Sequence, residues 1–170
     1  FIPDKGKQIG NTAGTGGDLV LDVKTLTITG NSGMELGTWG QGDSGSATIR
    51  SDEVILEGSY INGDVYGGGA VDENFQENWQ SVTGVGPFIS FETKNMSLSG
   101  ASSIDLTSTG AGDAGMLSIE TDFLELTGES KISSKATKTG DGGAVFIDAE
   151  KVLLNDGSEI ETLTEYIMPP

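Results

Sequence analysis

Short runs of alternating apolar and polar residues recur along this chain at a regular spacing. The first run of each unit carries two apolar residues two positions apart: Leu19/Leu21, Ala47/Ile49, Ile89/Phe91, Leu117/Ile119 and Val145/Ile147. A second run follows, with the pairs Leu26/Ile28, Val54/Leu56, Met96/Leu98, Leu124/Leu126 and Val152/Leu154. One further apolar residue ends each unit: Met34, Ile61, Ile104, Ile132 or Ile160. Because a period of two is typical of strands with one buried face, each unit is expected to contain three short strands.

The spacing of these units indicates a repeat architecture. Five glycines precede the first runs, at intervals of 28, 42, 28 and 28 residues: Gly14, Gly42, Gly84, Gly112 and Gly140. The long interval equals one period plus a 14-residue insertion. No stretch shows a helical period over ten residues, and a four-stranded propeller blade takes about 40 residues. We therefore predict an all-β fold, a right-handed parallel β-helix of about five coils of 28 residues with the insertion in coil two.

The same alignment predicts the organisation of the chain. Residues 14–162 form the parallel β-helix repeats, with the insertion loop at about 65–82. Residues 1–13 lack the pattern and are expected to form a partial coil or a cap, whereas 163–170 form a tail or the start of another coil. The unpaired strand edges of the two end coils predict end-to-end or edge association.

Three columns of equivalent residues outside the core carry specific expectations. The glycine column marks a corner that needs positive φ or a close approach of the backbone. A column of turn hydroxyls is expected to bind backbone groups, with a tyrosine in the odd coil: Ser32, Tyr60, Ser102, Ser130 and Ser158. A ladder of mostly opposite charges should bring neighbouring members within ion-pair reach: Lys24, Asp52, Lys94, Asp122 and Glu150.

Composition and charge exclude several classes of function. The formal net charge is −17 and only nine residues are basic, so no nucleic-acid partner is expected, and binding to an anionic membrane surface is disfavoured. No apolar run is long enough to span a membrane, so no membrane insertion is expected. The absence of Cys and His excludes zinc sites of the usual kinds, cysteine nucleophiles and Ser–His triads. No cofactor is expected.

Asp43, Asp113 and Asp141 follow three of the column glycines and suggest calcium as a metal. Ordinary turn hydrogen bonding by aspartate is the favoured interpretation, because one acidic residue per coil supplies too few calcium ligands. No metal site is therefore predicted, and these three residues stay as the calcium alternative.

The insertion concentrates aromatic residues in a chain that has few. Tyr66, Phe75 and Trp79 lie among Asp, Glu, Asn and Gln, a composition suited to contact with carbohydrate or with a protein surface. The other interpretation is that the loop folds back and uses its aromatic rings to cover an apolar face of the rod. Both interpretations stay open.

The residue pattern of the repeats resembles that of a known protein family. Residues 16–30 and 38–49, and the later Gly110–Ile119 and Gly140–Ile147, are similar to the repeats of filamentous-haemagglutinin-like exoproteins, particularly the cyanobacterial type. This resemblance implies a large protein that is secreted or displayed on the bacterial cell surface by a two-partner route and acts as a stalk or adhesin. The Asn-Pro-Asn motif of that family's secretion domain does not occur here, so no binding residue is carried over.

Two functions remain after these exclusions. The first is a structural and adhesive shaft segment, which needs no catalytic group and is therefore not an enzyme. The alternative is a polysaccharide lyase or glycoside hydrolase on a β-helix, since lyases of the pectate-lyase kind resemble one another in placing calcium-binding Asp beside Arg or Lys. Here the sole arginine, Arg50, lies among acidic residues, and an acidic rod repels a polyanionic substrate.

Overall fold

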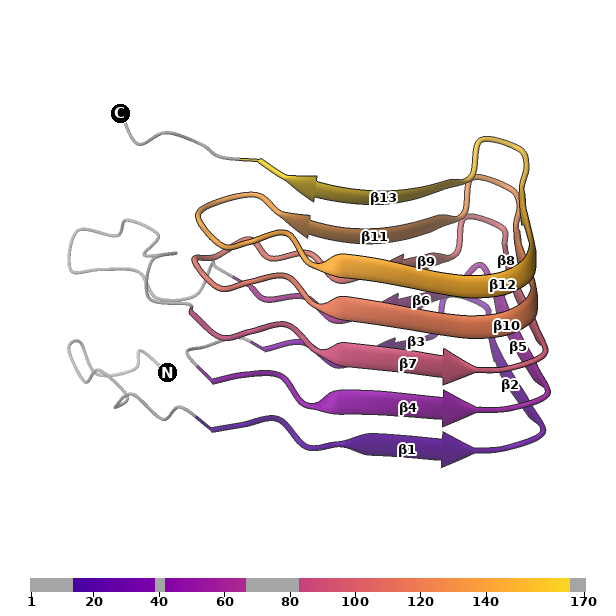
Figure 1. The fold of residues 1–170 in the computed structure, drawn as a ribbon, viewed down its shortest axis with the longest axis horizontal. Helices are drawn as coiled ribbons and strands as arrows, with labels where there is room; N and C mark the ends of the chain where they lie inside the picture. Colours follow the sequence, from indigo (N-terminus) through magenta and orange to yellow (C-terminus); the bar gives the residue numbers. More distant parts are fainter. Residues whose placement is uncertain (1–13, 39–41, 67–82, 166–170) are drawn as a thin grey trace, which may run out of the picture.

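The computed structural model describes residues 14–38, 42–66 and 83–165, and in these ranges every regular element is a β-strand. All strand pairs are parallel, and the coils stack in chain order from the indigo to the yellow end of the rod (Figure 1). The predicted all-β parallel solenoid of about five coils is confirmed. Within the described ranges no helix is present that could cross a membrane.

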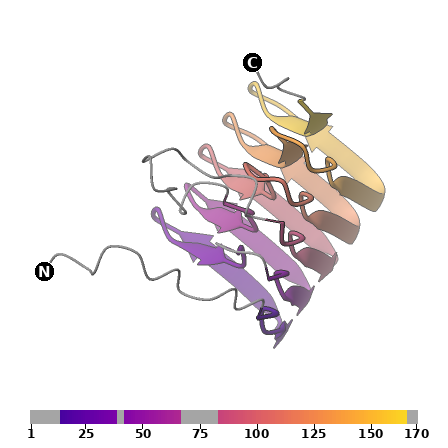
Figure 2. The same ribbon diagram turned by 90° about the vertical axis from the view of Figure 1, so that its left-hand side faces the viewer.

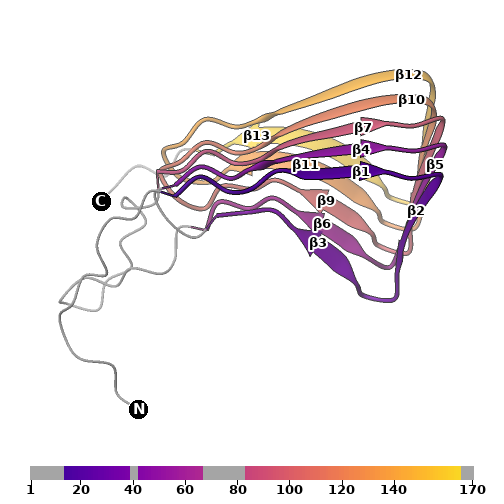
Figure 3. The same ribbon diagram turned by 90° about the horizontal axis from the view of Figure 1, so that it is seen from below.

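Figure 2 shows the coils stacked in chain order, and each coil contributes to three panels of the rod, which the view from below separates (Figure 3). The first panel contains β1 (Leu19–Asp22), β4 (Ser46–Arg50), β7 (Phe88–Glu92) and the first parts of β10 (Met116–Leu126) and β12 (Ala144–Leu154). The second contains β2 (Thr25–Thr29), β5 (Glu53–Glu57), β8 (Asn95–Ser99) and the remainder of β10 and β12. The third is a sheet of its own, formed by β3 (Gly33–Glu35), β6 (Tyr60–Asn62), β9 (Ser103–Asp105), β11 (Lys131–Ala136) and β13 (Glu159–Thr164).

The register of the panels follows the predicted period. Leu117 of β10 pairs with Ile89 on one side and Val145 on the other, so residues one period apart become neighbours. The first two strands of a coil are separate in coils one to three, as expected, but continuous in β10 and β12. The ladder between them extends to Thr121 and Ala149 at the bend and resumes at Phe123 and Lys151.

The core is a stack of aliphatic side chains with one aromatic ring. Phe91 is the largest fully buried side chain, and it sits in one column with Ile49 and Ile119. The predicted alternation therefore assigns the inward-facing positions correctly. Burial of these columns supplies the main stabilisation, about 25 cal/mol for each Å² of apolar surface removed from water.

The rod is a wedge in cross-section, and the glycine column lies at its narrow edge. Seen from below, the first and third panels converge away from the second (Figure 3). A Cβ on Gly112 would lie 1.9 Å from the carbonyl oxygen of Gly84, and one on Gly140 would lie 1.9 Å from that of Gly112. The expected close approach of the backbone is confirmed, because only glycine lets successive coils meet here. Positive φ occurs instead after the second strand, as at Gly30 and Gly128.

The hydroxyl column is confirmed with one correction. Backbone N–H groups of Ser59, Ser102 and Ser130 each donate to the serine Oγ of the next coil, at 3.1–3.2 Å. The assignment of Tyr60 to this column is wrong, because Tyr60 pairs with Gly33 in the third panel. Coil two is one residue shorter at this turn, which moves Ser59 into the column.

Candidate functional site

The insertion leaves the rod beside a half-buried carboxyl group, and this corner is the candidate functional site. Val65 bridges to Thr38 in coil one and to Ser108 in coil three, so coil two is still in register there. The backbone N–H of Tyr66 then donates to the carbonyl of Thr38 at 3.0 Å. Tyr66 also hydrogen-bonds through its side chain to Asp64, two residues earlier. The described chain thus holds Tyr66 on the rod surface at the point where the insertion starts.

Asp64 has the most perturbed carboxyl group in this corner. Burial, together with the nearby carboxylates of Asp105 and Glu35, raises the pKa of Asp64 to about 6, against the opposing effect of the hydrogen bond from Tyr66. The backbone N–H of Thr107 donates to its Oδ1 at 3.1 Å, which also favours the charged form. Burial together with the bond to Asp64 raises the pKa of Tyr66 to about 12. Perturbed groups of this kind are frequent at binding and catalytic sites.

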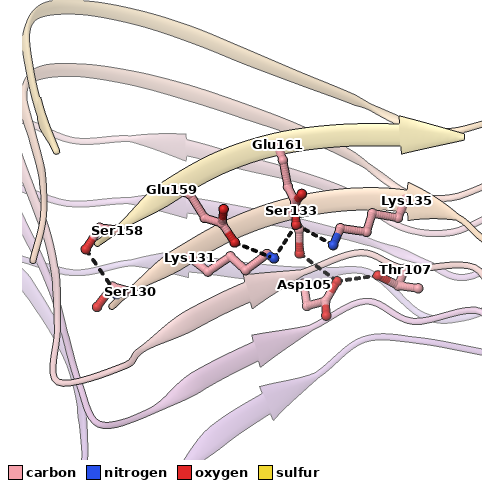
Figure 4. Close-up of polar contacts among 9 residues, drawn as sticks. All are labelled: Asp105, Thr107, Ser130, Lys131, Ser133, Lys135, Ser158, Glu159 and Glu161. Atoms are coloured by element: carbon pink, nitrogen blue, oxygen red, sulfur yellow. Dashed lines mark hydrogen bonds and ion pairs between the residues drawn. The ribbon is translucent and has the colours of Figure 1, made fainter. Parts of the chain in front are cut away.

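The polar surface continues from this corner across the third panel (Figure 4). Asp105 accepts hydrogen bonds from the hydroxyl groups of Thr107 and Ser133, the latter at 2.9 Å. These residues come from β9, β11 and the turn after β9, which the register of the panel places next to one another. Asp105 is therefore held in place by its neighbours, close enough to Asp64 to raise the pKa of that carboxyl group.

An ion-pair network occupies the upper part of the same panel (Figure 4). Lys131 Nζ lies 2.7 Å from Glu159 Oε1 and also pairs with Glu161, which in turn pairs with Lys135. The bonds to Glu159 and Glu161 raise the pKa of Lys131, and the two lysines lower the pKa of Glu161. The network connects β11 to β13.

Of the three aromatic residues predicted to bind a ligand, the structure locates one. Tyr66 is half-exposed at the corner just described. Phe75 and Trp79 lie outside the described residues, so the two interpretations of the insertion are not decided. The described corner offers a carboxyl group that titrates near neutral pH and a tyrosine side chain, a pair suited to hydrogen bonding with a hydroxyl-rich ligand.

The aspartates of the calcium alternative bond to backbone instead. Asp43 Oδ1 accepts the N–H of Val85 at 3.0 Å, and Asp113 Oδ1 accepts that of Asp141 at 2.8 Å. Each bond joins successive coils at the narrow edge of the wedge. In the part of the chain that the structure describes, no three acidic side chains gather closely enough to hold a metal ion. The side chains of Asp43 and Asp113 therefore bond to the backbone of the next coil, not to their own turn as the local Asx interpretation expected.

The predicted charge ladder lies at the bend between the first and second panels. Lys94 Nζ is 2.7 Å from Asp52 Oδ1, as the register requires, and the two groups shift each other's pKa toward the charged forms. Arg50 pairs with Glu92 at 3.1 Å in the neighbouring column. A shallow groove of about 380 Å³ follows the bend, and its charged lining consists of Glu92, Lys94, Glu120, Asp122, Asp148 and Glu150.

Sequence reasoning did not find Asp64, Asp105 or Glu35. These residues come from three coils, and their proximity depends on intervals of 27 and 43 residues instead of 28 and 42. The sequence does contain one signal for this shift, which is Ser59, the serine immediately before Tyr60. Aligning Ser59 with the other serines shifts coil two by one residue and places Asn62 between Glu35 and Asp105, with Asp64 two positions further along.

Comparisons with known proteins add no assignment to this geometry. No family model, no curated protein and no solved structure matches the chain. The function is therefore argued from the rod and its surfaces alone.

Proposed function

We propose that this chain is a structural and adhesive shaft segment of a large secreted or surface-displayed bacterial exoprotein. In this role the rod sets a distance and presents the segment that follows Tyr66 for contact with carbohydrate or with a protein surface. The resemblance to filamentous-haemagglutinin-like repeats supports the proposal, and so does the polar, strongly acidic surface, which favours solubility.

One observation carries the proposal: the charged side chains of the rod are used to join coils. Arg50 pairs with Glu92, Lys94 pairs with Asp52, and Lys131 pairs with Glu159, each across a coil boundary. Such groups stabilise the register of a stack. The alternative of a polysaccharide-cleaving enzyme requires a basic group free to act beside calcium-binding Asp, and Arg50 is already paired.

The experiment compares ligand binding by the intact chain and by a variant without the insertion. Coil three makes the same turn with only Thr109, Gly110 and Ala111 between Ser108 and Gly112. Replacing residues 66–83 by Thr-Gly-Ala therefore gives coil two the turn of coil three. Tyr66→Phe is a second variant, which keeps the insertion and removes only the hydroxyl group that bonds to Asp64, so it tests whether that hydroxyl contributes to binding.

The intact chain, the replacement variant and the Tyr66→Phe variant are each tested on a glycan array and on bacterial and host cell surfaces. Binding by the intact chain that disappears in the replacement variant, with an unchanged circular-dichroism spectrum, supports the adhesive role. Absence of binding by the intact chain contradicts that role, and turnover of any polysaccharide overturns the proposal in favour of the enzyme.

A further inference from the structure

Coil two is one residue short at the turn between the second and third panels, and a notch opens there. In coils one, three and four a residue with φ between 60° and 63° separates the glycine after the second strand from the serine of the hydroxyl column: Asn31, Ala101 and Glu129. In coil two, Ser59 follows Gly58 directly. The missing residue leaves a notch of about 300 Å³ on the surface between coils one and three.

The shortened turn also frees a backbone carbonyl group. In the regular turns the extra residue donates its N–H to the next coil, as Asn31 does to the carbonyl of Gly58 at 2.7 Å. Ala101 donates to Gly128 at the same distance. Coil two has no such donor, so among the described residues no backbone N–H bonds to the carbonyl oxygen of Gly100. That oxygen faces Gly58, 3.6 Å from where a Cβ on Gly58 would lie, and it is available to a ligand.

Polar side chains line the notch and are largely free to bind. The side-chain amide of Asn31 and the hydroxyl group of Ser103 make no hydrogen bond within the described residues, and both line the notch. Asn62 also lines it, and its Nδ2 reaches only Glu35 Oε1, at 3.5 Å. The notch therefore presents hydrogen-bond donors and acceptors from coils one, two and three.

An aromatic ring forms one side of the notch. Tyr60 lines it and stays partly exposed. A Cβ on Gly33 would lie 2.3 Å from Cε2 of Tyr60, so the ring lies directly against the backbone of coil one. The equivalent residue of coil three is Ser103, whose small side chain leaves room above the ring. Coil two thus adds a positioned aromatic surface to the polar groups.

The lining indicates the class of ligand. It contains no Asp, Glu, Lys or Arg, although the formal net charge of the chain is −17, so neither an anion nor a cation would find a charged partner inside the notch. Amide, hydroxyl and carbonyl groups exchange hydrogen bonds with hydroxyl groups, and a tyrosine ring packs against apolar C–H surface. Small-molecule sites measure about 300–1,000 Å³, and the lower limit suits one sugar residue.

We propose that this notch binds a single neutral sugar residue. Tyr60 packs against the sugar ring, while Asn31, Ser103 and the carbonyl of Gly100 bond to its hydroxyl groups. The notch lies at the turn between the second and third panels, on the opposite side of the wedge from the narrow edge (Figure 3). It is therefore separate from the corner of Tyr66, and the inference does not depend on binding by the segment that follows that residue.

The main test fills the notch without removing any of its side chains. Adding one Asn between Gly58 and Ser59 gives coil two the Gly-Asn-Ser turn of coil one. The added residue occupies the notch and supplies the missing N–H to the carbonyl of Gly100. Glu129→Asn is the matched control, because it places Asn at the same turn position of coil four, where the turn already has its full length.

A second variant keeps the notch and removes its ring. Tyr60→Ser gives coil two the residue that coil three has at this position. Urea unfolding and circular dichroism establish that each variant is folded. If the notch-filling variant does not fold, Tyr60→Ser alone decides the role of this surface.

Binding is measured by NMR titration of the backbone amides with the methyl glycosides of glucose, galactose, mannose and N-acetylglucosamine. At least one glycoside should shift the amide signals of Gly58, Ser59 and Ala101, with a Kd on the order of 1 mM. The notch-filling and Tyr60→Ser variants should each raise this Kd at least about tenfold. Glu129→Asn should keep it within about twofold, as should the variant in which Thr-Gly-Ala replaces residues 66–83.

Three results would overturn the inference. The first is the absence of amide shifts at the notch with all four glycosides. The second is a Kd that neither the notch-filling variant nor Tyr60→Ser changes. The third is tighter binding of glucuronate or glucosamine than of the neutral glycosides, since the lining offers no charged partner. None of these results touches the adhesive proposal, and loss of cell or array binding on removal of the insertion leaves the notch signals as they are.

Discussion

A single methyl group in the glycine column should separate two coils of the rod. In the Gly112→Ala variant the new Cβ would lie 1.9 Å from the carbonyl oxygen of Gly84, whereas an ordinary contact needs roughly 3.4 Å. The neighbour is backbone, so no side chain can rotate away, and the coils must move apart by about 1.5 Å. The Gly86 N–H bond to the Asp113 carbonyl, 3.0 Å long, lies beside this contact and would stretch.

The magnitude follows from two contributions. Overpacking costs about 1–3 kcal/mol, and loss of one or two hydrogen bonds costs about 0.5–1.5 kcal/mol each. We therefore expect Gly112→Ala to lower the free energy of unfolding by about 3 kcal/mol, measured by urea denaturation at a concentration where the protein is monomeric.

Gly14→Ala is the matched control for this prediction, because it adds the same methyl group in the same column at a position where no atom of the described residues lies within 4 Å. Its free energy of unfolding should stay within about 0.5 kcal/mol of the wild type, with a small gain from reduced freedom of the unfolded chain. Equal stability of the two variants would refute the argument that close backbone contact requires this column.

Three further substitutions test other parts of the rod. Ser102→Ala should lower the free energy of unfolding by about 1–3 kcal/mol in urea titrations, because the buried N–H of Ser59 loses its acceptor; an unchanged value would mean that another group satisfies it. Asp64→Asn should gain stability relative to the wild type as pH rises from about 4 to about 6. The reason is that the pKa of Asp64, about 6 when folded, lies above its ordinary value, so the native protein holds the proton through that window. Thermal unfolding at several pH values measures this difference, and a variant that loses stability relative to the wild type as pH rises would contradict the assigned pKa. Arg50→Gln should cost less than about 1 kcal/mol, since its pair with Glu92 is half-exposed; a cost that persists in 1 M salt would show a packing role instead of an ionic one.

The fold could be predicted from sequence because its information is local and repeated. Each coil shows the same alternation of apolar and polar residues. A strand position that is assigned wrongly in one coil is therefore corrected by comparison with the other four coils. The charge ladder was predictable for the same reason, since Asp52 and Lys94 stand on the regular side of the coil. Parallel stacking then converts sequence spacing directly into spatial neighbourhood.

The candidate site could not be predicted in the same way, because it lies where the repeat is irregular. The interval between glycines records only the sum of a one-residue deletion before Tyr60 and the much longer insertion after Tyr66. The interval therefore concealed the shift that brings Asp64 near Glu35 and Asp105. The strong rise in the pKa of Asp64 depends on burial in three dimensions, which no spacing in the sequence expresses.

The direction of the backbone hydrogen bonds has a mechanical consequence. Strands lie across the stacking direction of the coils, so their hydrogen bonds point along the stacking axis, as Figure 1 shows. Tension applied to the two ends along that axis therefore acts on one coil boundary at a time. The backbone hydrogen bonds of that boundary then break one after another. Each 28-residue coil that unravels releases about 95 Å of extended chain. The rod would resist compression and bending as a solid body, yet under tension it would lengthen in steps and limit the force that reaches whatever it holds.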